Sequence, residues 1–304
     1  MPRIVREAEV TWEGNVARGV GSLSAASSGA FSGLPYSVAS RVGNPEGKTS
    51  PEELLAAAHG GCFTMSLAGE LAKAGTPPVR LDVRCVVTMD EIEGKGHQVV
   101  HSEIVAHGTV PDCDDAAFAQ AAEVADAGCP LAALIRGTAT VTVSASLFND
   151  LSHHLHGRLI TMATERTMTT TWHGSLLDGA GTIAAAGSGA FGALEVTWAS
   201  RAEEPDGKTS PEELIAAAHS ACFSMALSHG LAQAGSPADR LDTSATVTFE
   251  PGEGITKVAL SVRGTVPGID AGTFVRAAEE AKVGCPVSKA LAGVPEITLD
   301  ATLA

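Results

Sequence analysis

The chain has 304 residues, of which 44% are hydrophobic and 18% are charged, and its formal net charge is -15. This composition predicts a globular protein with room for two domains, because a domain usually takes about 100 to 200 residues. The negative charge opposes binding to nucleic acid or anionic lipid. The amino terminus lacks an apolar leader and no run of about 18 apolar residues is evident, so we expect a soluble, cytoplasmic protein without membrane contact.

The order of alternating and helical patterns predicts an α+β unit in the first half of the chain. Apolar and polar residues alternate at 8–12 and 19–24, as in short antiparallel strands. After a long helix, we expect a hairpin around 93–96, a second helix at 115–127 and a closing strand at 139–147.

The long helix is predicted to begin at Pro51. Ser50 supplies a favoured N-cap, proline is favoured at the first helical position, and Glu53 is placed to complete a capping box. The apolar pattern continues to Gly75. Cys62 therefore lies near the middle of a largely apolar helix that is central to the fold.

A second cysteine is predicted to lie at a helix end. Cys129 directly precedes Pro130, which suits the first position of a short helix. Free backbone amides and the helix dipole stabilise a thiolate at such a place. Six cysteines are too few for a disulfide scaffold and none forms a CxxC pair.

The whole pattern occurs twice. The segment at 48–54 returns at 208–214 with an offset of 160 residues, and the Gly-Cys-Pro motif at 128–130 returns at 284–286 with an offset of 156 residues. The second copy is therefore four residues shorter. The loss falls in the predicted hairpin, where a change of length costs little.

We predict two domains, at 1–148 and 164–304, joined by a linker at 149–163. The linker has no counterpart in the other half. Its histidines at 153–156 could be interpreted as a metal-binding tract, but no acidic or cysteine ligand accompanies them, and we prefer a polar linker without a metal.

The motifs resemble the OsmC branch of the OsmC/Ohr hydroperoxide reductases. The resemblance lies in the run PEELIAAAHSACFSMAL at 211–227 and the later Gly-Cys-Pro, and the first copy, with Gly60-Gly61 before its cysteine, is somewhat less similar. It covers both halves almost end to end. It implies two OsmC-like units that form an intrachain pseudo-dimer, with antiparallel sheets wrapped around two long central helices.

The resemblance also implies a set of catalytic residues in each unit. Cys62 and Cys222 correspond to peroxidatic cysteines, Cys129 and Cys285 to resolving cysteines, Arg41 and Arg201 to the arginine beside the thiolate, and Glu52 and Glu212 to the carboxylate that holds this arginine. The implied substrate is an organic hydroperoxide and the implied reductant is a dithiol of the lipoyl type. No metal, flavin or haem cofactor is expected.

These residue types suit a thiol peroxidase. A free thiol has a pKa of about 8.5 and reacts only as the thiolate, so a nearby guanidinium that lowers the pKa activates it. The resulting sulfenic acid can condense with a second cysteine, and a dithiol can reduce the disulfide. The resemblance therefore implies reduction of organic hydroperoxides to alcohols in defence against oxidative and osmotic stress.

Helix geometry predicts that the sites cross between the two halves. Glu52 lies about 15 Å along the helix axis from Cys62, too far for both to contact one arginine. We therefore expect Glu212 and Arg201 to serve Cys62, and the first half's pair to serve Cys222.

Two other functions stay open at this stage. A redox sensor or a small apolar ligand-binding module would keep the cysteines without turnover, and a structural protein would bury them as unreactive core residues. Cys85 and Cys113 have no cysteine counterpart in the second copy and are interpreted as incidental. His59 and His219 are expected to pack or bond within the helix pair, outside the site.

Overall fold

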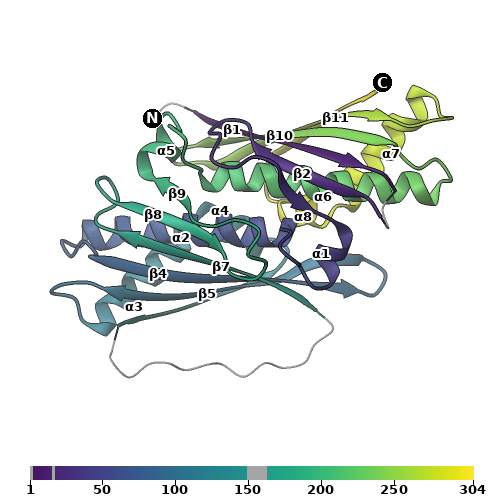
Figure 1. Cartoon of the computed structure of the whole chain (residues 1–304). Helices are drawn as coiled ribbons and strands as arrows, with labels where there is room; N and C mark the ends of the chain where they lie inside the picture. The colour runs from purple at the N-terminus through teal and green to yellow at the C-terminus, as the bar shows by residue number, and fades with distance from the viewer. Residues whose placement is uncertain (1–2, 16–17, 149–162) are drawn as a thin grey trace.

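Each of the two sheets takes three strands from each half of the chain. The computed structural model describes residues 3–15, 18–148 and 163–304. One sheet contains, in spatial order, β12 (Glu296–Leu303), β11 (Gly254–Thr265), β10 (Arg240–Glu250), β1 (Ile4–Glu13), β2 (Val20–Ala25) and β3 (Leu34–Tyr36). The other contains β6 (Thr140–Leu147), β5 (Gly96–Thr109), β4 (Arg80–Ile92), β7 (Thr164–His173), β8 (Ala180–Ala185) and β9 (Leu194–Thr197) (Figure 1).

The two halves meet within each sheet at an antiparallel pair of strands. Strand β1 pairs with β10, where Trp12 lies opposite Leu241, and β4 pairs with β7, where Leu81 lies opposite Trp172. Both tryptophans are fully buried. The first three strands of each half therefore complete the sheet of the other half, which accounts for the intrachain pseudo-dimer.

The sheets are antiparallel as predicted, except that the outer pair of strands at one edge of each sheet is parallel. Strand β6 runs parallel to β5, and β12 runs parallel to β11. Two helices connect the strands of each pair, and a crossover of this kind returns the chain in the same direction. These helices are α3 (Asp115–Ala127) and α4 (Pro130–Arg136) in the first half, and α7 (Ala271–Gly284) and α8 (Pro286–Ala290) in the second.

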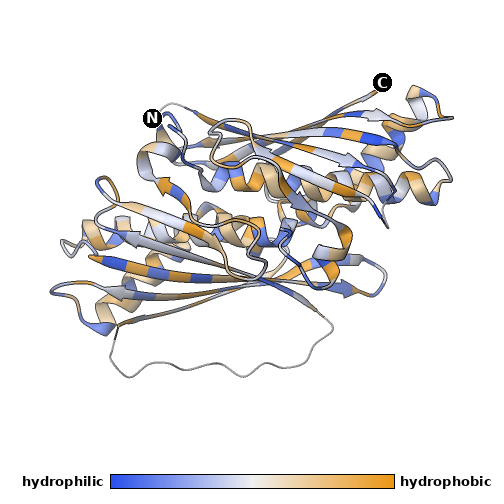
Figure 2. Cartoon of the chain, in the orientation of Figure 1, coloured by the Kyte–Doolittle hydropathy of each residue, from blue (hydrophilic) through white to orange (hydrophobic). Residues whose placement is uncertain are grey.

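Two long helices, α2 (Pro51–Lys73) and α6 (Pro211–Gln233), contact each other between the two sheets (Figure 1). Helix α2 packs against β4 and β7, and α6 packs against β1 and β10. A helix that is apolar on all sides is stable only when it is buried on all sides. The strands instead alternate between hydrophobic and hydrophilic residues (Figure 2). The predicted α+β fold around two central helices is confirmed.

Helix α6 is also long and apolar enough to cross a membrane, contrary to the expectation from the sequence. Among the described residues it is the single helix that meets these criteria, and α3 and α4 meet them only as a pair bent by 67°. In α6, 83% of the apolar window is buried inside the protein. Its hydrophobicity is thus used in packing against the sheets and α2.

The predicted start of the long helix is confirmed, but its capping box is not. The Ser50 hydroxyl accepts a hydrogen bond from the Glu53 amide. The Glu53 carboxylate does not return to Ser50, because it accepts bonds from Thr49 and from the amide and hydroxyl of Ser188 in the other half. Glu213 accepts the same pair of bonds from Ser28. The buried helix starts therefore connect the two halves.

Residues 149–162, which include nearly all of the predicted linker and its histidines, lie outside the described residues. The domain boundaries that we placed at 148 and 164 remain predictions.

Candidate active site

The first candidate site is built around two buried sulfur atoms. Cys62 lies in the middle of α2, and Cys129 is the N-cap residue of α4, where Pro130 begins the helix. The two Sγ atoms are 3.4 Å apart, and both residues are fully buried. This distance leaves the thiols unbonded and brings them within reach of a disulfide.

A buried arginine from the other half contacts the first of these sulfurs. Arg201 lies in the short helix α5 (Trp198–Ala202), and its Nη2 atom is 3.4 Å from the Cys62 Sγ. Its Nε and Nη2 atoms donate to Glu212 Oε1 at 3.0 and 2.7 Å. Glu212 is fully buried at the start of α6. The first site thus combines two cysteines of one half with an arginine and a glutamate of the other.

The second candidate site repeats this arrangement with the halves exchanged. Arg41, in α1 (Val38–Val42), lies with its Nη2 atom 3.3 Å from the Cys222 Sγ. It donates to Glu52 Oε1 from Nε at 2.9 Å and from Nη2 at 2.6 Å. Cys285 is the N-cap residue of α8, as Cys129 is of α4, and its thiol shares a hydrogen bond with that of Cys222. The predicted crossing of the sites is confirmed by these contacts, and all eight predicted residues fall into two clusters of four.

At the first site, the cysteine in the long helix is the more acidic. The Cys129 thiol donates to Cys62 and, together with the Arg201 guanidinium, lowers the pKa of Cys62 to about 7 against the opposing effect of burial. Burial and the negative Cys62 raise the pKa of Cys129. Although burial disfavours its charge, the neighbouring Cys62 and Glu212 raise the pKa of Arg201, which therefore stays protonated.

At the second site, the cysteine at the start of the short helix has the lower pKa. Burial opposes ionisation of Cys285, but donation from Cys222 and from the amide and hydroxyl of Ser288 lowers its pKa to about 7. Burial and the bond to Cys285 raise the pKa of Cys222, while Arg41 lowers it. One sulfur of the pair is therefore the thiolate. The Arg41 guanidinium, 3.3 Å from the Cys222 Sγ, stabilises the negative charge when it lies on that sulfur.

Comparison with known proteins agrees with the repeat. The model of the family described as OsmC-like protein matches residues 43–144 and 204–300. The chain belongs to the OsmC-like family. Each matched region contains the glutamate and both cysteines of one half, and the arginines Arg41 and Arg201 lie just before the matched regions.

The chain is similar to OsmC-like proteins of about half its length. It is 46% identical over 132 residues to Peroxiredoxin OsmC of Escherichia coli, a match that covers 42% of this chain and 90% of that protein. Among solved structures, an organic hydroperoxide resistance protein OsmC from Legionella pneumophila is 21% identical with a TM-score of 0.35, over 44% of this chain and 94% of that one. OhrB of Bacillus subtilis is also 21% identical, with a TM-score of 0.33, over 44% and 96%.

In this OsmC-like chain, a further arginine positions each site arginine, which the sequence did not reveal. Arg166 of β7 donates to the backbone carbonyls of Ser40, Arg41 and Gly43, at 2.6, 2.8 and 3.0 Å. Arg6 of β1 likewise donates to carbonyls at and after α5. These bonds satisfy the C-terminal carbonyls of the short helices that carry the site arginines.

The side chains around the two site arginines differ between the halves. Arg201 Cζ lies 4.9 Å from the centroid of the Phe249 ring and 6.0 Å from that of Trp198. At the other site, Arg41 Nη2 lies 3.5 Å from Met89 Sδ, and the position that corresponds to Trp198 is Val38. The sequence contained this difference, but only the structure shows that it falls at the sites.

The two buried histidines bind serines outside the helix pair, so the expectation that they pack or bond within this pair is wrong for their hydrogen bonds. His59 Nδ1 lies 2.8 Å from the hydroxyl of Ser102 on β5, and His219 Nε2 lies 2.7 Å from that of Ser288 on α8. Burial lowers the pKa of each histidine to about 3. Both are therefore neutral and outside the two clusters.

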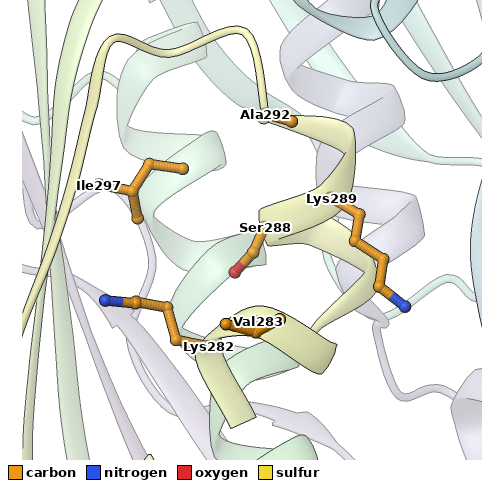
Figure 3. A pocket seen from close by; sticks show the side chains of 6 residues that line it. All are labelled: Lys282, Val283, Ser288, Lys289, Ala292 and Ile297. Atoms are coloured by element: carbon orange, nitrogen blue, oxygen red, sulfur yellow. The ribbon is translucent and has the colours of Figure 1, made fainter. Parts of the chain in front are cut away.

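A surface hollow of about 250 Å³ lies between α7, α8 and β12. Figure 3 shows its lining residues, which are Lys282, Val283, Ser288, Lys289, Ala292 and Ile297. The amines of the two lysines point in different directions and do not converge on one point. Among the described residues, no group of three histidine, cysteine or acidic side chains could hold a metal ion.

Proposed function

We propose that this chain is a cysteine-based thiol peroxidase that reduces organic hydroperoxides to alcohols at two crossed sites. One observation carries the proposal: in each cluster, a buried arginine held by a glutamate contacts a cysteine that lies beside a second cysteine. Peroxiredoxin OsmC of Escherichia coli, to which 42% of the chain is 46% identical, supports a role in removing peroxides.

The first step is attack of the Cys62 thiolate on the terminal oxygen of the hydroperoxide. A sulfur–oxygen bond forms and the O–O bond breaks, so the sulfur is oxidised to a sulfenic acid and an alkoxide leaves. Arg201 remains charged and stabilises this alkoxide as it takes up a proton to become the alcohol. Glu212 holds the guanidinium by two bonds to Nε and Nη2.

The second step is condensation of the sulfenic acid with the neighbouring thiol. The sulfurs of Cys62 and Cys129 are already 3.4 Å apart, so a small shift closes the disulfide and releases water. A dithiol then restores both thiols by exchange. At the second site, Cys222 first passes its proton to Cys285, and the Cys222 thiolate beside Arg41 then performs the same steps. Such recycling needs a reducing compartment, and we place the protein in the cytoplasm on that ground.

A carbon-bearing peroxide suits the setting of the sulfurs. Phe63 and Leu67 in α2, and Phe223 and Leu227 in α6, are fully buried neighbours along the same helices as the reactive cysteines. Apolar lining favours a substrate with an organic group. Lipoyl-type dithiols are the reductant that we propose.

The test measures peroxide-dependent oxidation of excess dithiol by the natural protein, by Cys62→Ser, by Cys222→Ser and by the variant with both changes. With a hydroperoxide that both sites accept, we expect about half the activity in each single variant and none in the double variant. A redox sensor would instead consume about one peroxide per site and then stop. Activity that survives in the double variant would contradict the proposal.

A further inference from the structure

The side chains around the two site arginines, which we call the walls of the sites, differ because the two copies carry different residues at equivalent positions. At the Cys62 site, the guanidinium of Arg201 lies near two aromatic rings, Phe249 at 4.9 Å and Trp198 at 6.0 Å. Trp198 is only partly buried. An aromatic pair of this kind offers a large apolar surface beside the charged group.

The equivalent walls of the Cys222 site are smaller and include a sulfur. Val38 occupies the position of Trp198, and Met89 occupies the position of Phe249. The Met89 thioether accepts a bond from Arg41 Nη2 at 3.5 Å. The Arg41 side chain is 10% exposed, against 4% for Arg201. The charged group is thus less covered by apolar atoms at this site.

A buried phenol adds polarity at the Cys222 site. Tyr36, on β3, is fully buried, and its hydroxyl lies close to Ser224 without a hydrogen bond to any described residue. Tyr36 directly precedes Ser37, the N-cap residue of the short helix α1 that carries Arg41 to Cys222, and burial raises the pKa of its phenol. The equivalent residue in the other half is Val196, which has no polar group. A buried, unpaired hydroxyl can donate to a bound peroxide oxygen.

We infer that the two sites divide peroxides by size and polarity. The Cys62 site takes bulky, apolar hydroperoxides, such as aryl-substituted ones, because Trp198 and Phe249 bury their organic group. The Cys222 site takes hydrogen peroxide and short alkyl hydroperoxides, because its walls are small and Tyr36 offers a donor. This inference rests on the proposed peroxidase function and names the substrate class of each site.

The experiment uses full-length variants that keep one site each, Cys222→Ser and Cys62→Ser, with excess dithiothreitol as reductant. For each variant, kcat/KM is measured with cumene hydroperoxide and with hydrogen peroxide. We expect the ratio of the two values to be at least about tenfold higher in Cys222→Ser, since a difference of one apolar group in a binding pocket discriminates by about 10 to 200-fold. Equal ratios, or a higher ratio in Cys62→Ser, would overturn the inference.

Exchanging the wall residues provides the matched control. Trp198→Val in the Cys222→Ser background should lower the ratio, and Val38→Trp in the Cys62→Ser background should raise it. Because the second change adds a ring to a partly exposed position, it tests the idea even if the first variant folds poorly. If neither single-site variant turns over any peroxide, the proposed function itself fails. If both turn over with one common ratio, only the division of substrates fails.

Discussion

The crossing of the sites makes a prediction about which pairs of mutations are additive. Cys62→Ser inactivates the first site and leaves the second site, formed by Cys222 with Arg41 and Glu52, intact. Adding changes to Arg201 and Glu212 should then cost little more activity, because they serve the site already lost. Adding changes to Arg41 and Glu52 should abolish the rest, although these residues lie in the same half as Cys62.

The magnitude follows from the contact between the guanidinium and the sulfur. At 3.3 Å and an effective dielectric constant of about 20, two unit charges interact by about 5 kcal/mol, which is an upper bound for this pair. Loss of one stabilising donor at a developing anion usually costs about 2.7 to 4 kcal/mol, or about 100 to 1,000-fold in rate. The second site should therefore fall to about 1% or less of its activity.

The changes must not leave a buried charge without its partner. Glu52 and Glu212 are fully buried, and removal of the arginine alone would destabilise the fold by about 3 to 5 kcal/mol. We therefore pair Arg41→Met with Glu52→Gln, and Arg201→Met with Glu212→Gln. Thermal unfolding of each variant checks that the fold persists.

The assay is steady-state oxidation of dithiothreitol by a hydroperoxide that both sites accept. With Cys62→Ser as the common background, the Arg201 and Glu212 changes should keep about half of the natural activity, and the Arg41 and Glu52 changes should keep about 1% or less. If the first combination were inactive and the second kept half, each site would lie within one half of the chain, and the argument from helix length and contacts would be refuted.

Three further predictions concern ionisation, the disulfide and the packing of α1. In Cys222→Ser, the rate of reaction with peroxide should level off above pH 7 and fall about tenfold per pH unit below it, because a lowered pKa of about 7 keeps Cys62 ionised only above that pH. Stopped-flow measurements that place the inflection near pH 8.5 would contradict this. Adding Cys129→Ser should let a sulfenic acid persist on Cys62, which mass spectrometry detects as an adduct with a sulfenic-acid trapping reagent. Rapid loss of the sulfenic acid in this variant would argue against Cys129 as the resolving group. Arg166→Met should lower the free energy of unfolding by about 1.5 to 3 kcal/mol in denaturant titrations, because carbonyls at the end of α1 lose a charged donor. The control Arg84→Met removes an exposed ion pair with Glu103 and should change the free energy of unfolding by less than about 1 kcal/mol.

The parts of the fold that the sequence predicted are those with a local cause. Ser50 and Pro51 define a helix start through neighbouring groups alone, and the Gly-Cys-Pro motif places Cys129 at a helix end for the same reason. The crossing of the sites was also predictable, because the rise of one helix separates Glu52 from Cys62.

The parts that the sequence did not predict depend on which segments pair in space. Alternation in β1 indicates a strand with one buried face, but it does not say that the partner is β10 of the other half. The capping-box prediction failed for a similar reason, since Ser188 competes for the Glu53 carboxylate from a distant segment. In the sequence, the wall residues Phe249 and Met89 look like ordinary buried strand residues. Only the structure shows that they contact Arg201 and Arg41.

The reactive geometry of each site exists only when the two halves are interlocked. At the second site, Cys222 comes from one half and Arg41 from the other, and Arg166, which holds the end of α1, comes from the half of the cysteine again. The first site repeats this order with Cys62, Arg201 and Arg6. The contacts that join the halves are thus in part the contacts that place the guanidinium on the sulfur. Packing of the halves and activation of the thiol therefore share interactions, and a change that loosens the contact between the halves acts on both sites at once.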